Sequence, residues 1–360
     1  MSKLRRIKSI YSRIKSVSDK SDKGIYVVLK DFSELRKKNK LSFQEYDHYK
    51  LANRNPEFRK TFLPYAKAEE YWEILNPKKY ACLARDKYIG HCLLESVGIP
   101  TSNLIAYYNP EGASTTGKVV INYDEIADLL ITSGYNTFVI KPASDSAHGE
   151  GVIICRELIK NGKELIIRKT DGSKIGLRQL LRDTPLLFET LIYQTAEFAS
   201  FNKTSLNTVR IMTALYPDHT VRVFAGFLKI GRIGSDVDNA GSGGNIDCGV
   251  NVETGQLYNT VQFNSWDDII KIKEHPDSKV KLEGYYIKDW NKIKERLQYF
   301  QGLIPQLKTI GWDVAITDDG PVIVEINNWW DTTGQEFIDR GWAPEVKDCY
   351  DAWVKFYSKK

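Results

Sequence analysis

The chain has 360 residues, enough for two or three domains with well-formed cores. Its hydrophobic content of 42%, charged content of 27% and net charge of +5 are ordinary for a globular protein and argue against a strongly basic nucleic-acid binder. The five cysteines form no C-x-x-C pair, which predicts reduced thiols and argues against a zinc site built on them.

The sequence shows neither a membrane-spanning run nor a secretion signal. No apolar run approaches the ~18 residues that a membrane helix needs. The N-terminus also lacks the apolar core of a signal peptide. We therefore expect a cytoplasmic protein.

Residues 1–23 differ from the rest of the chain because they carry eight basic and two acidic residues. Apolar residues recur at helical spacing between the basic ones, which predicts a basic amphipathic helix. Such a helix is suited to an anionic membrane surface, and we expect peripheral association through residues 1–17 as one possibility. The alternative is a helix whose apolar stripe packs on the protein itself.

The remaining elements alternate between helices and mainly antiparallel strands. Residues 24–80 read as mostly helical. After them, RDKYIGHCLLESVGIPTS predicts a helix that ends near Gly98 and Pro100. Strands are then predicted at 136–155, with an intervening glycine loop, at 186–192 and as two runs within 206–230. A glycine-rich stretch at 231–249, a helix around 289–308 and a final strand pair at 312–317 and 322–328 complete an α+β pattern.

The stretch GWDVAITDDGPVIVEINNWWD, residues 311–331, places acidic side chains in an apolar hairpin. Glu325 and Asn327 are two residues apart on a strand and face the same side, and the hairpin brings Asp313 opposite them. Oxygen-bearing side chains are costly in an apolar sheet unless something compensates them. A hard cation such as Mg²⁺ prefers these ligands, so we predict a metal site of Asp313, Glu325 and Asn327. The alternative is a strand-end cap and an exposed strand face.

Lys141 ends a predicted strand and precedes the small-residue loop ASDSAHGEGV. An ammonium in that place can reach an anion, and the loop's backbone N–H groups can turn toward phosphate oxygens. Gly-Glu-Gly is also a good hairpin turn, so the loop alone does not decide between these interpretations. The sequence is neither a P-loop nor a G-x-G-x-x-G dinucleotide motif.

Taken together, RDKYIGHCLLESVGIPTS, FVIKP, SDSAHGEGV, LLFETLI and the late Asp…Glu-x-Asn pair resemble the ATP-grasp superfamily over roughly residues 80–340. The resemblance implies two α+β subdomains that clasp ATP, preceded by a mostly helical N-terminal region. We accordingly expect five parts. These are a basic helix at 1–23, a helical region at 24–80, a subdomain with the lysines and phosphate loop at 81–185, a subdomain with the metal site at 186–345 and a C-terminal helix at 346–360.

The resemblance also implies which residues bind ATP. Lys87 and Lys141 would bind phosphates, and the loop would close over them. Glu189 with neighbouring backbone groups would read adenine, and Gln194 or Glu197 the ribose. The predicted ATP-binding set is Lys87, Lys141, Ser146, His148, Gly149, Gly151, Glu189, Leu191, Ile192, Gln194 and Glu197.

SLNTVRI and RIGSDVDNAGSGG, residues 205–211 and 232–244, are similar to segments of the sugar-transfer-associated ATP-grasp family. We expect Arg210, Lys141, Asn207 and Arg232 to act on the reacting groups. An arginine fork suits phosphate or carboxylate, and the alternative for Arg210 is a structural ion pair with Glu189 or Glu325. NWWDTTGQE departs from the Pro-Gly segment that follows Glu-x-Asn in many superfamily members, which puts the acceptor in doubt.

The resemblance implies an ATP- and Mg²⁺-dependent carboxylate–amine ligase that forms an amide through an acyl phosphate. The expected partners are a small-molecule or glycan carboxylate and an amine or amino acid, with no nucleic acid. The family's link to surface polysaccharides suggests a bacterial uronic acid as the carboxylate. The alternatives are a peptide-type amino acid ligase, a kinase that phosphorylates a hydroxyl, and a non-catalytic ATP-binding protein of a glycan assembly complex.

Overall fold

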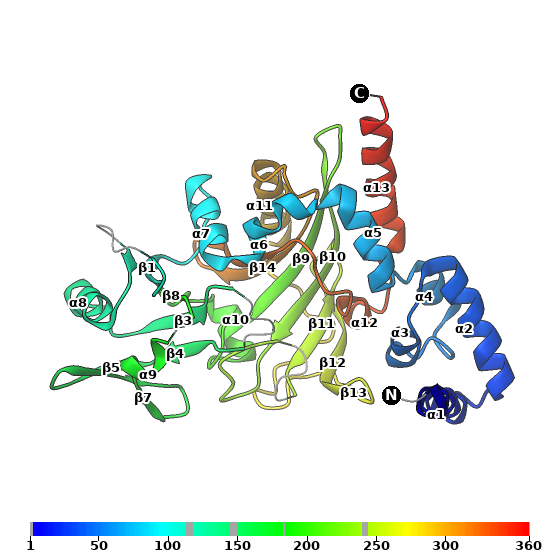
Figure 1. The fold of residues 1–360 in the computed structure, drawn as a ribbon, viewed down its shortest axis with the longest axis horizontal. Coiled ribbons are helices and arrows are strands. Elements are labelled where there is room, and N and C mark those ends of the chain that lie inside the picture. Colours follow the sequence, from blue (N-terminus) through cyan, green and yellow to red (C-terminus); the bar gives the residue numbers. More distant parts are fainter. Residues whose placement is uncertain (1–2, 113–117, 145–149, 183, 240–243, 360) are drawn as a thin grey trace. The chain divides into compact units, whose positions relative to one another are not determined.

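The computed structural model describes residues 3–112, 118–144, 150–182, 184–239 and 244–359. The chain divides into two compact units (Figure 1). One combines Met1–Leu75 with Asp331–Lys360, and the other spans Asn76–Trp330. The finer five-part division expected from the sequence stays a prediction.

The first unit is helical in the residues that the structure describes, which confirms the helical N-terminal region. Its C-terminal helix packs on the last helix of the N-terminal part, where the rings of Tyr71 and Tyr350 lie 4.8 Å apart. The helices of this unit are α1 (Lys3–Ser21), α2 (Ile25–Asn39), α3 (Phe43–His48), α4 (Pro56–Thr61), α5 (Tyr65–Leu75), α12 (Gly334–Phe337) and α13 (Ala343–Tyr357).

Helix α1 is the predicted basic helix, and it packs against α2. Two of its apolar side chains, Ile14 and Val17, are buried, while Tyr11 is exposed. This burial matches the packing alternative for that part of the stripe, and membrane association stays a prediction. No helix in the described ranges is both long and apolar enough to cross a bilayer.

The N-terminal part of the second unit carries a five-stranded sheet of order β2-β1-β8-β3-β4 and a three-stranded sheet of order β5-β6-β7. Helix α8 covers the larger sheet, since Ile126 and Leu130 share a core cluster with Phe138 and Phe188. The elements are η1 (Lys78–Tyr80), α6 (Cys82–Arg85), α7 (Lys87–Ser96), β1 (Leu104–Tyr108), β2 (Val119–Val120), α8 (Tyr123–Ser133), β3 (Phe138–Pro142), β4 (Ile153–Cys155), β5 (Glu157–Asn161), β6 (Glu164–Arg168), β7 (Lys174–Gly176), α9 (Leu177–Leu180) and β8 (Leu186–Glu189).

The C-terminal part of the second unit is a seven-stranded antiparallel sheet of order β13-β12-β11-β10-β9-β14-β15. Strands β11 to β13 were not predicted from the sequence, which assigned a glycine-rich stretch to 231–249 and no element to the residues between 250 and 288. The elements are α10 (Ala196–Phe201), β9 (Thr208–Leu215), β10 (Val221–Ile230), β11 (Ile246–Val250), β12 (Leu257–Ser265), β13 (Asp268–Lys271), α11 (Trp290–Leu303), β14 (Thr309–Thr317) and β15 (Gly320–Asn327).

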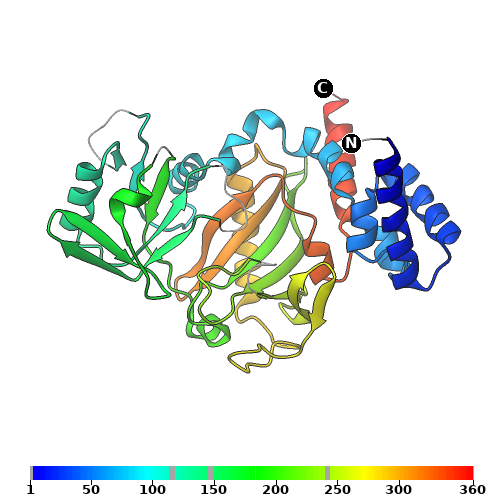
Figure 2. The same ribbon diagram turned by 60° about the horizontal axis from the view of Figure 1, so that its bottom comes forward.

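The two faces of the seven-stranded sheet differ in polarity because side chains alternate along each strand. One face is apolar. Helix α11 packs against this face (Figures 1 and 2). Val209, Leu228 and Trp312 belong to this core. The residues between them point to the opposite face, which we call the polar face. It carries the side chains of Arg210, Lys229, Asp247, Asp313, Glu325 and Asn327.

A short segment, residues 100–103, hydrogen-bonds to both large sheets. The N–H of Ile323 on β15 donates to the Pro100 carbonyl at 2.8 Å, and the Thr101 hydroxyl donates to the Ile323 carbonyl at 2.9 Å. On the other side, the N–H of Thr190 donates to the Asn103 carbonyl at 2.9 Å. The segment therefore joins β15 to the end of β8.

Candidate active site

The hairpin of β14 and β15 brings the three predicted metal ligands to the polar face. Asp313 and Glu325 are directly opposite each other in the antiparallel register, and Asn327 is opposite Gly311. Directly opposed residues of an antiparallel pair project their side chains to the same side. Residue 311 is closely surrounded, because a Cβ there would lie 3.2 Å from the Met212 Sδ, 3.3 Å from the Trp330 Cβ and 3.4 Å from the Arg210 Cδ.

Asp313 is held by two cations in this structure. The Arg210 guanidinium binds it in a bidentate manner, with Nε and Nη2 at 2.7 and 2.8 Å from the two carboxylate oxygens, and the Lys229 ammonium lies 3.0 Å from Oδ1. Burial would raise the pKa of Asp313, but Arg210 and Lys229 outweigh it and hold the pKa well below its usual range. The ion pair considered for Arg210 is therefore made with Asp313, not with Glu189 or Glu325.

The acceptor capacity of Asp313 is filled. Its Oδ1 accepts from Arg210 and lies beside Lys229, while Oδ2 accepts from Arg210 and from the Asn327 amide at 3.5 Å. A carboxylate offers about four lone-pair sites. A metal ion that binds Asp313 must therefore displace one of these donors.

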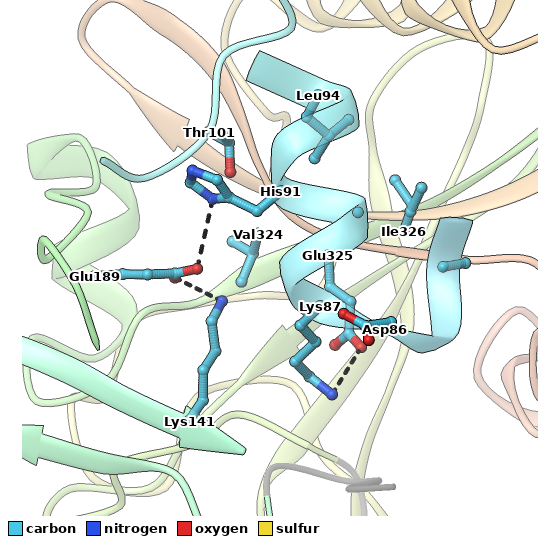
Figure 3. A pocket seen from close by; sticks show the side chains of 12 residues that line it. Asp86, Lys87, His91, Leu94, Thr101, Lys141, Glu189, Val324, Glu325 and Ile326 are labelled. Atoms are coloured by element: carbon cyan, nitrogen blue, oxygen red, sulfur yellow. Dashed lines mark ion pairs between the residues drawn. The ribbon is translucent and has the colours of Figure 1, made fainter. Parts of the chain in front are cut away.

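Glu325 faces Lys87, whose ammonium lies 3.5 Å from its Oε1 (Figure 3). The Glu325 side chain is 35% exposed, so a ligand can reach it. Together with Asp313 and Asn327 it offers only oxygen donors, which suit Mg²⁺ in chemistry. The described residues hold no cluster of three histidine, cysteine or acidic side chains arranged for a metal ion. The donor set thus fits magnesium only in combination with Asn327 and after Asp313 gives up a cation.

Lys141 forms a second buried ion pair, with Glu189. The Lys141 ammonium lies 2.6 Å from Oε2, the Ser102 hydroxyl donates to the same oxygen at 2.8 Å, and the His91 Nδ1 lies 3.6 Å from Oε1 (Figure 3). Burial raises the pKa of Glu189, but Lys141, His91 and Ser102 together lower it to about 2. The Glu189 carboxylate is therefore ionised at neutral pH and forms an ion pair with Lys141.

The two lysines converge because the start of α7 lies against the end of β3. The backbone N–H of Lys87 donates to the Ala143 carbonyl at 2.7 Å, just beyond Lys141 and Pro142. Asp86 caps the helix by accepting from the N–H of Ile89 at 3.0 Å. This fixes the direction in which α7 leaves, and His91, four residues after Lys87, lies on the same helix face.

These groups line one cavity between α7, β3, β8 and β15 (Figure 3). Its volume of about 20 Å³ holds a single water molecule. A nucleotide does not fit until the surrounding side chains separate. The polar side chains that line the cavity are Asp86, Lys87, His91, Thr101, Lys141, Glu189 and Glu325.

Part of the predicted phosphate loop lies outside the described residues, namely Ser146, His148 and Gly149. Gly151 follows it with a φ of +77°, and a Cβ there would lie 2.8 Å from the Pro142 ring. Only glycine fits this turn without strain. The loop therefore returns close to the strand end that carries Lys141.

Two predicted residues act as internal braces in this structure. The Gln194 amide donates to the carbonyls of Asn202 and Ser205, both at 3.0 Å, and accepts from the N–H of Asn207 at 2.9 Å. The fully buried Asn207 amide donates to the carbonyls of Phe198 and Asn202. Because these groups are satisfied internally, the structure does not bring Gln194 or Asn207 into the cavity.

Three further predicted positions lie after β8. Leu191 and Ile192 are half-buried in the segment that follows Glu189. Glu197, on α10, accepts from the N–H of Lys288 at 3.3 Å. None of them lines the cavity of Lys87 and Lys141.

Arg232 also lies apart from the cavity. Its guanidinium binds Asp277 in a bidentate manner, with distances of 2.7 and 2.6 Å. The arginine therefore ties the glycine-rich stretch to the segment after β13, and its side chain is 30% exposed.

Sequence reasoning missed four polar residues near the site, which are His91, Ser102, Lys229 and Asp247. His91 had a signal, since it stands four residues after Lys87 on a predicted helix. Lys229 interrupts the apolar run VFAGFLKI, as Arg210 interrupts its own strand. Asp247 had none, because its strand was not predicted.

The sequence match decides the family. The sugar-transfer associated ATP-grasp family matches residues 66–348, most of the chain. The chain belongs to this family. The α+β class and the family expected from the sequence are thereby confirmed, and the matched range contains the hairpin, both lysines and Arg210. No curated protein matches the chain.

Solved structures resemble this ATP-grasp chain at low sequence identity. N5-carboxyaminoimidazole synthetase from Staphylococcus aureus, complexed with ADP, has a TM-score of 0.41 and 14% identity, covering 77% of this chain and 54% of its own. D-alanine–D-alanine ligase from Bacillus anthracis has a TM-score of 0.40 and 13% identity, covering 77% and 69%. The chain thus spans about half the length of the first structures it matches.

Proposed function

We propose that this protein is an ATP-dependent carboxylate–amine ligase that forms an amide through an acyl phosphate. The observation that carries the proposal is the convergence of Lys87, Lys141 and Glu325 on one cavity in a chain of the ATP-grasp family. Two lysines suit a polyphosphate, and a partly exposed carboxylate suits the divalent ion that accompanies it.

Both lysines of the cavity form ion pairs. Each ammonium is paired with a carboxylate, Lys87 with Glu325 and Lys141 with Glu189. Phosphate oxygens would replace part of this pairing when the side chains separate to admit ATP.

The reaction would proceed in two steps. A substrate carboxylate oxygen attacks the γ-phosphorus, and the bond to the β-phosphate oxygen breaks to release ADP. An amine nitrogen then attacks the acyl carbon, the acyl–phosphate bond breaks, phosphate leaves and the amine gives up a proton. Lys87 and Lys141 would stabilise the phosphoryl oxygens, and Arg210 would offset the charge that gathers near Asp313.

Asp313, Glu325 and Asn327 would hold magnesium, which neutralises charge on the phosphates when bound.

The carboxylate substrate would belong to a glycan. The family's description links it to sugar transfer, so the carboxylate would be a uronic acid of a bacterial surface polysaccharide, joined to an amino acid or another amine. Residues 1–17 would place the protein at the inner face of the membrane.

The decisive experiment is a screen of uronic acids against amino acids and amines, with ADP release and product mass as the readouts. With an ¹⁸O-labelled carboxylate, a ligase transfers one ¹⁸O into the released phosphate, because the attacking oxygen leaves with phosphorus. A kinase would leave the label in the substrate. ADP formation without label transfer would overturn the proposal.

Glu325→Ala is the matching variant, and we expect ADP release to fall by about 100-fold or more because the phosphate charge loses its counter-ion site. The side chain is partly exposed, so the fold should persist and be checked by circular dichroism. A Glu325→Ala protein with wild-type ADP release would contradict the metal role.

A further inference from the structure

The polar face continues beyond Asp313 onto strands that the proposed reaction does not use. In the register of β9 and β10, Thr208 is opposite Lys229, and in the register of β10 and β11, Lys229 is opposite Asp247. Arg210, opposite Asp313, lies two residues from Thr208 on β9. Lys229 and Asp247 therefore belong to the row of side chains beside the one that contains Asp313.

Asp247 is a buried carboxylate that forms no hydrogen bond within the described residues. Its exposed fraction is 0%, and within the described chain neither carboxylate oxygen has a hydrogen-bond partner. Burial raises the pKa of Asp247 well above its usual value, Lys229 lowers it and Asp238 adds to the rise. An unpaired buried carboxylate costs free energy, so its presence in the core of the sheet needs a reason.

Lys229, by contrast, is shared among several acceptors on its other side. Its ammonium lies 3.0 Å from Asp313 Oδ1 and 3.9 Å from Asp238 Oδ1, and it donates to the Asn239 side-chain oxygen at 3.4 Å. Asp238 is fixed by the backbone N–H and hydroxyl of Thr208, at 2.8 and 2.6 Å. Among the described residues, Lys229 is thus paired with Asp313 and Asp238 and forms no ion pair with Asp247.

We propose that the Lys229 ammonium moves from Asp313 to Asp247 when a divalent ion binds Asp313. The inference rests on the proposed function, since it requires the metal site there. Lys229 and Asp247 would be positioning residues that make Asp313 available. Directly opposed residues have Cβ atoms about 5 Å apart, within reach of a lysine's four-carbon stem.

The charges explain why Lys229 needs another anion close by. The acceptor sites of Asp313 are filled, so an incoming ion displaces a donor. Lys229 makes one contact with Asp313 and is easier to release than Arg210, which makes two. A buried ammonium left beside a metal ion would be repelled by it and would lose its closest anion. Asp247 supplies a replacement anion in the next row, so no buried charge is stranded.

The test measures Mg²⁺ binding without turnover, using MgCl₂ titrated into protein that is saturated with ADP and followed by calorimetry. Asp247→Asn keeps the side-chain size but removes the charge. We expect the Mg²⁺ concentration at half-saturation to rise on the order of tenfold, while the ion-free variant is at least as stable as the wild type because an unpaired carboxylate is gone. An ordinary structural role would lower stability instead.

The double variant of Lys229→Met and Asp247→Asn tests whether Asp247 affects Mg²⁺ binding through Lys229. In Lys229→Met, no ammonium competes for Asp313, so Asp247→Asn should change the Mg²⁺ midpoint by less than about twofold in that background. Asp268→Asn, which removes an exposed carboxylate from β13 of the same sheet, is the matched control and should leave the midpoint unchanged.

The outcomes separate this inference from the proposed function. A wild-type protein that binds no Mg²⁺ in the presence of ADP would defeat the proposed function and the inference with it. Normal binding by the wild type with an unchanged midpoint in Asp247→Asn would overturn the inference alone. A full effect of Asp247→Asn in the Lys229→Met background would also overturn it, since Asp247 would then act by another route. Destabilisation of ion-free Asp247→Asn would count against it as well.

Discussion

Glu189 and Asp247 are both buried acidic residues on strands, yet they differ in the charged and hydrogen-bonding groups that surround them. Glu189 is contacted by Lys141, Ser102 and His91, whereas Asp247 has no hydrogen-bond partner among the described residues. The pKa of Glu189 is accordingly lowered to about 2, and that of Asp247 is raised well above its usual value. Burial raises the pKa of both carboxyl groups, and the charged and hydrogen-bonding partners decide whether the pKa ends below or above its usual value.

The largest effect is expected when Glu189 loses its cation and so comes to resemble Asp247. Lys141→Met removes the main partner of Glu189, so the variant buries a carboxylate without its cation. We expect the free energy of unfolding to fall by about 3 kcal/mol and ADP binding to be lost. Denaturant unfolding and calorimetry measure the two effects. Lys160→Met, an exposed lysine on β5, should change neither.

The pH dependence of stability sharpens the comparison. Because the folded-state pKa of Glu189 is about 2, below its usual value of 4.5, its ion pair contributes stability that is fully present above pH 4.5 and lost as the pH falls toward 2. We expect about 3 kcal/mol to disappear across this window. In Glu189→Gln this part of the acid dependence should be absent, so the two unfolding curves should converge at low pH. Parallel curves would contradict the assignment.

Ser102→Ala is a milder way to weaken the same site. It removes one hydrogen bond to a charged acceptor but leaves Lys141 in place, so the expected loss of unfolding free energy is about 1 to 2 kcal/mol. Thermal unfolding measures it. Ser96→Ala, an exposed serine at the end of α7, serves as the control. An equal loss in both variants would show that the hydroxyl of Ser102 has no particular role.

The smallest effect on stability is expected for charges that water already solvates. Arg13 and Lys15 on α1 are exposed, so Arg13→Glu with Lys15→Glu should change the unfolding free energy by less than about 0.5 kcal/mol. If residues 1–17 bind an anionic membrane, the same variant should lose sedimentation with phosphatidylserine vesicles. Retained sedimentation would favour the packing alternative for this helix.

The sequence predicted what depends on local pattern. Alternation placed Glu325 and Asn327 on one face, and the turn at Asp318 to Gly320 returned Asp313 to them. The ion pairs were harder to predict, because they depend on strands that are neighbours in the sheet but distant in the sequence. Arg210 meets Asp313 only because β9 lies beside β14. A single chain does not encode that adjacency in any local pattern.

The glycine-rich stretch shows the other limit. It contains the turn residues of a loop, and the short strand IDCGV at its end lacks a repeating pattern long enough to predict. Asp247 therefore went unnoticed, although it lies fully buried opposite Lys229. The family resemblance assigned Gln194 to the ribose and Asn207 to the reacting groups, whereas in this structure both side chains donate to backbone carbonyls.

The segment at 100–103 limits how the protein can admit a molecule as large as ATP. Its bonds to Ile323 on one side and Thr190 on the other are backbone links that do not depend on the cavity's side chains. When the two large sheets separate, the displacement must be small beside this segment and grow with distance from it.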